Sequence, residues 1–339
     1  MRVGSIVFAT DQGLGILAKS FYDHGIITHP LIIKHTSRPT HREWYDPKTP
    51  YIETIDSNYI RRFCDNVDVM LFFETPFDWS AIQYCQNRGV KTVLMPMFEC
   101  EPEHLPCAPD MFLNPSLLDQ QYYPYSNGSG KTIDSIFLPV PVDEGIKWKQ
   151  RTEAKIFIHN AGHGGILGRN GTAQVIDAMK FVKSPIQLIL RSQNHLKWGV
   201  DDPRVDIQIG NAPYDSLWDE GDVFLFPERF NGLSLPLQEA RASGMLVMCG
   251  DRFPMNTWLP REPLIPVQGY NRTRINGRFN SFDDAIFSPE TVAATIDEWY
   301  GRDISAISSS GAEWASQNSW KSLKPKYLEV LQKLVEGSL

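Results

Sequence analysis

The chain has 339 residues, of which 42% are hydrophobic and 12% aromatic, and it carries a formal net charge of -7 at pH 7. This length is typical of two domains, and the apolar content is sufficient for two packed cores. The negative charge argues against a general affinity for nucleic acids, which requires a basic surface. The first apolar run, residues 3–9, is too short for a signal peptide, and no run approaches the roughly 18 apolar residues that a membrane span needs.

The five cysteines are an odd number without paired spacing, which favours free thiols and a reducing compartment. We therefore expect a cytoplasmic protein. Cys100, Glu103, His104 and Cys107 are bunched as C-x-x-E-H-x-x-C and could supply zinc ligands. Because prolines crowd this loop and no C-x-x-C pair is present, we expect no metal site.

Short apolar runs alternate with helical patterns in the first half of the chain, as in βα units that build a parallel sheet. The predicted strands are residues 3–9, 31–34, 69–73, 91–95, 111–113 and 135–138, and the predicted helices are 14–24, 57–64 and 79–88. We expect a Rossmann-like domain over residues 1–145. A polar, proline-punctuated stretch over residues 139–152 forms the predicted connection to a second domain.

The same alternation begins again in the second half. The predicted strands are residues 155–160, 187–190, 205–208, 223–226 and 245–249, and the predicted helices are 172–181, 214–219, 235–243 and 289–300. This pattern predicts a second doubly wound domain over residues 146–310. Residues 311–339 carry apolar and aromatic side chains at helical spacing, which predicts a C-terminal helix.

The most informative run is residues 225–244, L-F-P-E-R-F-N-G-L-S-L-P-L-Q-E-A-R-A-S-G. It predicts a buried strand, a turn of small residues and a helix that begins near Pro236 and ends at Gly244. The free backbone N–H groups at such a helix start bind anions. Glu239 lies about one turn inside the helix, where its carboxylate could meet ribose hydroxyls while the helix start meets a diphosphate. The run therefore predicts a nucleotide site.

This run resembles the motif E-G-F-G-L-P-x-x-E-A-x-A-x-G of the retaining GT-B glycosyltransferases of family 4. The first Glu of the motif is Asn231 here, and the second Gly is Ser234. The resemblance implies an α/β GT-B fold, in which two Rossmann-like domains face a cleft and a C-terminal helix crosses back to the first domain. It also implies that Gly232, Leu233 and Ser234 contact the donor phosphates, that Asn231 meets the donor sugar and that Glu239 holds the ribose.

Two glycine loops add candidate residues. In the first βα turn, Gly13, Leu14 and Gly15 allow close approach of a ligand to the backbone, or form a tight turn with no ligand role. At the start of the second domain, a glycine-rich loop carries His163, Arg169 and Asn170. It suits a loop that wraps a diphosphate while a cation offsets the charge. Asn170 stands where the resembled family has Lys, so Arg169 is the nearest predicted cation, with a surface salt bridge as the alternative.

Further candidates follow other predicted strands. Arg191 comes after the second strand of the second domain, and Asn211 and Tyr214 lie where the resembled family holds the nucleobase. In the first domain, Glu74 and Glu99 follow neighbouring strands, so we expect them at the ligand-binding edge of the sheet. We therefore predict Asn231, Glu99, Glu74 and Arg169 as catalytic residues. Ordinary solvated loop residues are the alternative for each of these groups.

Two stretches combine basic and aromatic side chains. The first contains Lys34, His35, Arg38, His41, Arg42, Trp44, Tyr45, Lys48 and Tyr51, and the second, residues 270–280, contains Arg272, Arg274 and Arg278. Such loops can stack on bases or sugars and contact phosphate. They indicate an anionic acceptor, such as modified DNA, a lipid phosphate or an acidic glycan, unless both are simply solvated loops.

The predicted function is the transfer of a sugar from a nucleoside diphosphate sugar, such as a UDP- or GDP-sugar, to a hydroxyl acceptor. By the family resemblance, the anomeric configuration is retained and no metal is required. Two alternatives remain at this stage: a GT-B epimerase that acts on a nucleotide sugar, and a protein that binds sugar nucleotides or glycans without catalysis.

Overall fold

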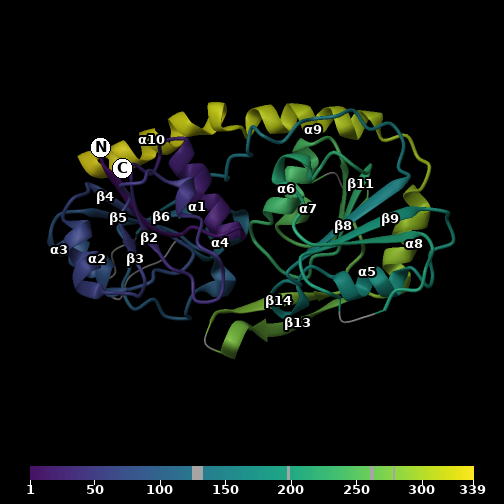
Figure 1. Cartoon of the computed structure of the whole chain (residues 1–339), viewed down its shortest axis with the longest axis horizontal. Helices are drawn as coiled ribbons and strands as arrows, with labels where there is room; N and C mark the ends of the chain where they lie inside the picture. The colour runs from purple at the N-terminus through teal and green to yellow at the C-terminus, as the bar shows by residue number, and fades with distance from the viewer. Residues whose placement is uncertain (124–132, 197–198, 260–262, 278) are drawn as a thin grey trace. The chain divides into compact units, whose positions relative to one another are not determined.

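The computed structural model describes residues 1–123, 133–196, 199–259, 263–277 and 279–339. They form two compact units, each discontinuous in the sequence (Figure 1). Unit 1 comprises Met1–Pro141, Arg278–Asn280 and Trp320–Leu339, and unit 2 comprises Val142–Gly277 and Ser281–Ser319.

Unit 1 is built on a seven-stranded parallel sheet with the order β3-β2-β1-β4-β5-β6-β7. Its strands are β1 (Val3–Phe8), β2 (His29–Ile33), β3 (Tyr51–Ile52), β4 (Val69–Phe73), β5 (Lys91–Met95), β6 (Met111–Asn114) and β7 (Asp134–Phe137). Every residue of the central strand β4 is buried, as expected for a parallel sheet that helices cover on both faces. The strand order reverses between β1 and β4, and open sheets of this kind bind ligands at that point.

The helices of unit 1 are α1 (Gly13–Asp23), α2 (Ser57–Cys64), α3 (Ser80–Asn87), α4 (Leu117–Tyr122) and α10 (Trp320–Glu336), with short 3-10 turns η1 (Arg42–Trp44) and η2 (Phe98–Cys100). Helix α10 joins this unit through an aromatic cluster. The rings of Trp320 and Tyr327 lie 5.0 Å and 5.1 Å from that of Phe21 on α1, and the Tyr327 hydroxyl donates to the Pro139 carbonyl (3.0 Å). The C-terminal helix therefore packs on the first Rossmann-like unit, as predicted.

Unit 2 is built on a five-stranded parallel sheet with the order β10-β9-β8-β11-β12. Its strands are β8 (Ile156–Gly162), β9 (Gln187–Ser192), β10 (Val205–Ile209), β11 (Val223–Phe226) and β12 (Leu246–Cys249), and a separate antiparallel hairpin comprises β13 (Gly269–Arg274) and β14 (Ser281–Ile286). Here the order reverses between β8 and β11, so the second doubly wound sheet has its own switch point.

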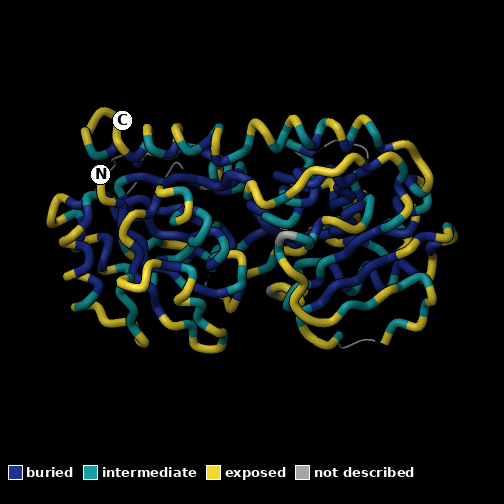
Figure 2. The backbone as a smooth tube through the Cα atoms, turned by 45° about the horizontal axis from the view of Figure 1, so that its top comes forward, coloured by how far each residue is buried: buried dark blue, intermediate teal, exposed yellow. Residues whose placement is uncertain are grey.

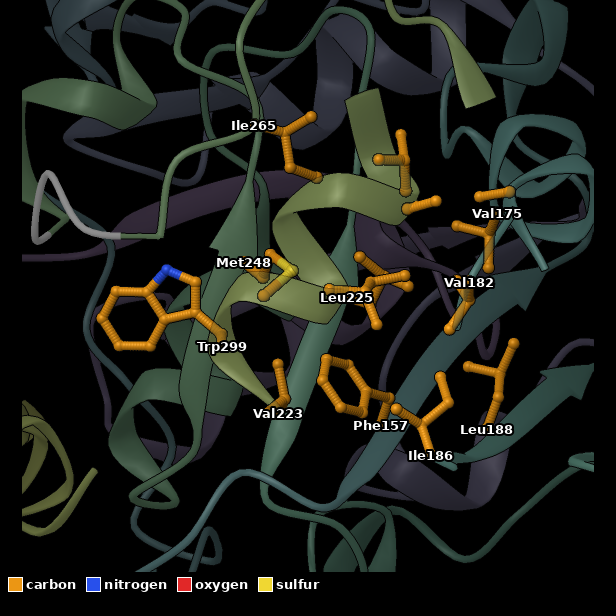
Figure 3. Packing of buried hydrophobic residues seen from close by; sticks show 14 of the residues in the cluster. Phe157, Val175, Val182, Ile186, Leu188, Val223, Leu225, Met248, Ile265 and Trp299 are labelled. Carbon is orange, nitrogen blue, oxygen red and sulfur yellow. The ribbon is translucent and has the colours of Figure 1, made fainter. Parts of the chain in front are cut away.

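Helices cover both faces of this second sheet. They are α5 (Thr172–Ala178), α6 (Leu235–Ala242), α7 (Met255–Trp258), α8 (Pro289–Trp299) and α9 (Ser305–Gln317), with 3-10 turns η3 (Ile166–Gly168), η4 (Tyr214–Ser216) and η5 (Ile275–Gly277). Successive strand residues point to opposite faces. In β11, Val223 and Leu225 pack with α5 and α8 (Figure 3), whereas Phe224 and Phe226 pack with α6 and α7. The central strands run through the buried interior of each unit, and the exposed residues lie mainly in loops, on edge strands and on outer helix faces (Figure 2).

The structure departs from the predicted elements mainly outside the two sheets' central strands. Strand β3 and helices α4 and α7 were not predicted, the helix predicted over residues 311–339 is divided into α9 and α10, and the helix predicted over residues 214–219 is the shorter turn η4. The basic stretch over residues 270–280 is not a loop but part of the β13–β14 hairpin. Within the described part of the chain, no helix combines the length and apolar character that crossing a membrane requires.

Candidate functional site

The switch point of unit 2 is formed by the loops that follow β8 and β11, residues 163–171 and 227–234. The two loops are joined directly: the Arg229 amide donates to the Arg169 carbonyl (2.7 Å), and the Arg229 guanidinium donates to the Leu167 carbonyl (3.1 Å). Gly171 permits this contact, because a Cβ there would lie 2.3 Å from the Pro227 carbonyl oxygen and its φ is +73°. The predicted glycine loop and the predicted anion-binding turn therefore lie side by side.

His159 joins the elements from which the two loops extend. It is buried on β8, and its two ring nitrogens lie 2.9 Å from the Leu225 carbonyl on β11 and 2.8 Å from the Thr172 hydroxyl at the start of α5. Burial lowers the pKa of His159 to about 4, so the ring is neutral at pH 7. A neutral imidazole donates through one nitrogen and accepts through the other, which matches its carbonyl and hydroxyl partners.

The start of α6 presents backbone donors. Among the described residues, the N–H groups of Gly232, Ser234 and Leu235 have no hydrogen-bond acceptor, whereas the Leu233 amide donates to the Asn231 side-chain oxygen (3.0 Å). Ser234 adopts the left-handed conformation (φ +43°) as the N-cap residue, yet its hydroxyl does not cap the helix. That hydroxyl is buried and also has no partner in the described structure. Free donors at a helix start attract an anion.

A buried ion pair and its hydrogen bonds hold the turn that precedes α6. Arg252, after β12, pairs with Glu228, after β11 (3.2 Å), and the side chains are only 5% and 3% exposed. The same guanidinium donates to the carbonyl oxygens of Glu228 (2.7 Å) and Asn231 (3.0 Å). Because these carbonyls are turned toward Arg252, the turn keeps a fixed conformation.

Glu239 lies on the second turn of α6 and is half-buried. The Tyr214 hydroxyl donates to its carboxylate (2.8 Å). Burial raises the pKa of Glu239 to about 7, the Tyr214 hydrogen bond opposes this rise, and the charge of Asp143 adds to it. The predicted nucleobase residue and the predicted ribose carboxylate are therefore in direct contact.

The other predicted residues of unit 2 have structural partners. Asn170 donates to the Ala161 carbonyl (2.9 Å) and so closes the loop that follows β8. The buried guanidinium of Arg191 donates to Gln208 (3.0 Å) and to Glu220 (2.5 Å). Asn211 is exposed, and its side-chain oxygen accepts a hydrogen bond from the Gln193 side chain (2.9 Å). The loop residues His163 and Arg169 are half-buried.

At the switch point of unit 1, Gly13 and Gly15 have different surroundings. Gly13 is exposed at the first position of α1, and a Cβ there would meet nothing within 4 Å; the next residue, Leu14, is half-buried. A Cβ on Gly15 would lie 2.1 Å from the Thr10 carbonyl oxygen. Gly15 is therefore required for packing of α1 against the turn that follows β1, while Gly13 leaves the start of α1 open.

The predicted carboxylates of unit 1 belong to a larger acidic group. Glu74 follows β4 in the left-handed conformation (φ +52°) and is half-buried. Glu99 is 1% exposed. Burial raises the pKa of Asp119 to about 8, and the neighbouring charge of Glu99 adds to the rise. The pKa of the fully buried Glu101 is raised well above its usual range by burial, and further by Asp119 and Glu74.

The basic loop of unit 1 lies at the carboxyl end of β1. The His41 amide donates to the Ala9 carbonyl (2.7 Å), and the His41 ring stacks on Trp44 (4.7 Å between centroids). Arg42 lies over the ring of Tyr51 (4.6 Å). This loop therefore combines cations with aromatic faces beside the start of α1.

The second basic stretch differs from the prediction. It lies in the β13–β14 hairpin, and Arg272 pairs with Asp283 on the opposite strand (2.9 Å). The third predicted cation, Arg278, lies outside the described residues. Because the cross-strand acid offsets part of the charge, this stretch is less basic than its sequence indicates.

The cysteine-rich loop does not form a metal site in the described ranges, where no three His, Cys, Asp or Glu side chains are grouped to hold an ion. All five cysteines are free thiols.

Solved structures match the chain along its whole length. The match to sucrose-phosphate synthase from Thermosynechococcus elongatus has a TM-score of 0.63 at 12% identity and covers 100% of both chains. The match to Anabaena HepE, solved in complex with UDP, has a TM-score of 0.68 at 11% identity and covers 98% of this chain and 100% of the other. The chain has the GT-B fold. WaaG, a glycosyltransferase involved in lipopolysaccharide biosynthesis, also matches this GT-B chain, with a TM-score of 0.54 at 12% identity over 97% and 99% of the two chains.

No protein-family model and no curated protein sequence matches the chain. The solved structures confirm the resemblance to GT-B glycosyltransferases at the level of the fold.

Three buried residues of this GT-B chain were missed in the sequence: Glu228, Arg252 and Glu101. Glu228 and Arg252 carry opposite charges just after the adjacent strands β11 and β12. Since neighbouring parallel strands end at the same edge of a sheet, that arrangement could have predicted the ion pair. Glu101 lies two residues after the predicted Glu99, but its complete burial depends on packing that the sequence does not reveal.

Proposed function

We propose that this chain is a glycosyltransferase that moves a sugar from a nucleoside diphosphate sugar to a hydroxyl acceptor. The observation that carries the proposal is the start of α6, where the N–H groups of Gly232, Ser234 and Leu235 are free among the described residues and Glu239 follows one turn later. A diphosphate fits the donors and a ribose fits the carboxylate. The proposed transfer retains the anomeric configuration, because the run over residues 231–244 resembles that of the retaining family 4 enzymes.

The leaving diphosphate gains negative charge as the sugar departs, so the donors aimed at it stabilise the transition state. The free N–H groups supply part of this stabilisation. Arg169 supplies the cation, since its backbone is hydrogen-bonded to Arg229 beside the same turn. In the proposed reaction these groups, rather than a metal ion, meet the charge of the diphosphate.

Glu239 accepts hydrogen bonds from the ribose hydroxyls in its ionised form, while Tyr214 orients the carboxylate and lies beside the base. Asn211 is proposed to border the same base from the exposed loop after β10. Asn170 and Arg191 are proposed to support the site without contacting the nucleotide. Asn170 closes the loop after β8, and Arg191 joins β9 to β10.

The acceptor is proposed to bind unit 1 near the start of α1 and the basic loop over residues 34–51. The cations and aromatic rings of that loop suit an anionic acceptor. Glu74, which is half-buried at the end of β4, is the carboxylate proposed to face the acceptor hydroxyl. The buried Glu99 is proposed to act indirectly, by packing beside Asp119.

The test is incubation of the purified protein with a panel of UDP- and GDP-sugars, with and without anionic acceptors, followed by product analysis. Transfer, or slow donor hydrolysis, supports the proposal, and retention is read from the anomeric NMR signal of the product. Glu239→Ala is expected to abolish nucleotide binding, whereas Glu298→Ala, a matched removal of an exposed acid from α8, should leave it unchanged. Unaltered binding by Glu239→Ala would refute the assignment.

A sugar-nucleotide-binding protein without turnover is the second candidate. Asn170 favours it, because the residue is neutral where the resembled family has Lys and its side-chain amide is hydrogen-bonded to the Ala161 carbonyl. Nucleotide-sugar binding without hydrolysis, transfer or isomerisation in the same assay would identify this function, and isomerised donor would identify an epimerase.

A further inference from the structure

The side-chain amide of Asn231 is held at both ends. Its Nδ2 donates to Glu228 Oε1 (2.9 Å), and its Oδ1 accepts from the Leu233 amide (3.0 Å). Rotating the amide by half a turn would place oxygen against a carboxylate and NH2 against an N–H donor. The two contacts therefore fix its orientation.

Glu228 is itself held by a buried guanidinium. Its Oε2 accepts from Arg252 (3.2 Å), and both side chains are almost fully buried. Arg252 also binds the backbone carbonyls of Glu228 and Asn231. The two buried groups compensate each other's charge, so removing either one would leave the other without a partner of opposite charge.

This geometry dictates what residue 231 can be. A carboxylate at this position would face the Glu228 carboxylate at hydrogen-bond distance, where two such groups cannot both stay ionised. An amide satisfies Glu228 and keeps one N–H and one oxygen lone pair for other partners. An acid at position 231 would thus not fit beside the Glu228–Arg252 pair of this chain, which has an amide there.

We propose that Glu228, held by Arg252, is a specificity-determining residue of the donor site: it requires a neutral amide at position 231, and the remaining N–H of that amide donates a hydrogen bond to an oxygen of the donor sugar. This inference rests on the function proposed above and on the contact of Asn231 with the donor sugar that the resemblance to family 4 implies. A carboxylate at the same position can only accept, so it could not make this hydrogen bond.

An isosteric exchange separates the two parts of this inference. Asn231→Asp brings two carboxylates together, so its melting temperature should fall by several degrees at pH 8 and recover partly at pH 5, where a shared proton joins them. The double variant Glu228→Gln with Asn231→Asp reverses the pair: the new amide can donate to Asp and accept from Arg252. Its melting temperature should return close to that of the wild type. Glu298→Gln serves as the matched acid-to-amide control.

Binding then tests the specificity, with UDP against UDP-glucose, and GDP against GDP-mannose, as probes. In the double variant the nucleoside diphosphate should bind as in the wild type, whereas the nucleotide sugar should bind about tenfold more weakly, the loss expected for one hydrogen bond. A double variant no more stable than Asn231→Asp would overturn the pairing. Wild-type affinity of the double variant for the nucleotide sugar would overturn the specificity. If the wild type binds none of these nucleotides, the proposed function fails and the specificity falls with it, while the melting temperatures still decide the pairing.

Discussion

Replacing Glu239 by glutamine should stabilise the protein at alkaline pH and weaken nucleotide binding at the same time. Glutamine keeps an oxygen that can accept from Tyr214, so the substitution removes the charge and little else. Burial raises the pKa of Glu239 from its ordinary value of 4.5 to about 7. The folded state therefore holds the proton more tightly than the unfolded chain, and the wild type loses stability as the pH rises through 7.

The size of the effect follows from the pKa. The difference of 7 − 4.5 = 2.5 corresponds to about 3.4 kcal/mol at about 1.36 kcal/mol per pH unit for a fully dry carboxylate. Because the side chain is half-buried, solvent screening reduces this to about 1–2 kcal/mol. For a domain of this size, that raises the melting temperature of Glu239→Gln by about 2–6 °C at pH 8.

The assay is thermal unfolding of the wild type, Glu239→Gln and the exposed control Glu298→Gln at pH 5, 6, 7 and 8. The advantage of Glu239→Gln should be small at pH 5 and grow to pH 8, while the control stays level with the wild type. Titration with UDP and GDP should show weaker binding by Glu239→Gln at pH 8, and wild-type binding should strengthen from pH 6 to 8 as the carboxylate ionises. A variant that is less stable than the wild type at pH 8, or an advantage that does not change with pH, would refute the reasoning.

Two further predictions concern Gly15 in the first glycine loop and Arg169 in the second. Gly15→Ala should lower the free energy of unfolding in urea by about 2 kcal/mol or more, because its Cβ would lie 2.1 Å from the Thr10 carbonyl oxygen. Gly13→Ala, the control, should be neutral or slightly stabilising. Equal effects of the two substitutions on stability would contradict the packing role of Gly15. Arg169→Met should weaken binding of UDP or GDP by about 10- to 100-fold, as expected for loss of a charged hydrogen bond. The exposed Arg302→Met is its control, and unchanged nucleotide affinity in Arg169→Met would remove the residue from the proposed site.

The sequence was sufficient to predict the central strands of both sheets. Fully buried parallel strands appear as short apolar runs, and both β4 and β11 have this pattern. The start of α6 was also predictable, because small residues followed by Pro236 mark a turn and a helix start. Contact between Tyr214 and Glu239 was not predicted as such, although both residues were assigned to the same nucleotide.

The hairpin was harder to predict, because a two-stranded ribbon outside the main sheet lacks a continuous apolar pattern. In β13 no residue is fully buried, so Arg272 and its neighbours resemble a solvated loop. The hydrogen-bond partners of the Asn231 side chain were also not predicted from the sequence. Glu228 is only three residues away, but it is held by Arg252, which is distant in sequence and is brought close by the pairing of β11 with β12.

The discontinuity of unit 1 has a consequence for the order in which the protein is made. The ribosome synthesises strands β1–β7 first, but Trp320 and Tyr327, which close the aromatic cluster around Phe21, follow only after unit 2 has been synthesised. Until α10 has been synthesised, Phe21 on α1 lacks these two aromatic partners, and the apolar surface that they cover stays exposed, which favours aggregation. Unit 2, whose sheet and helices α5–α9 are complete by Ser319, can finish folding first.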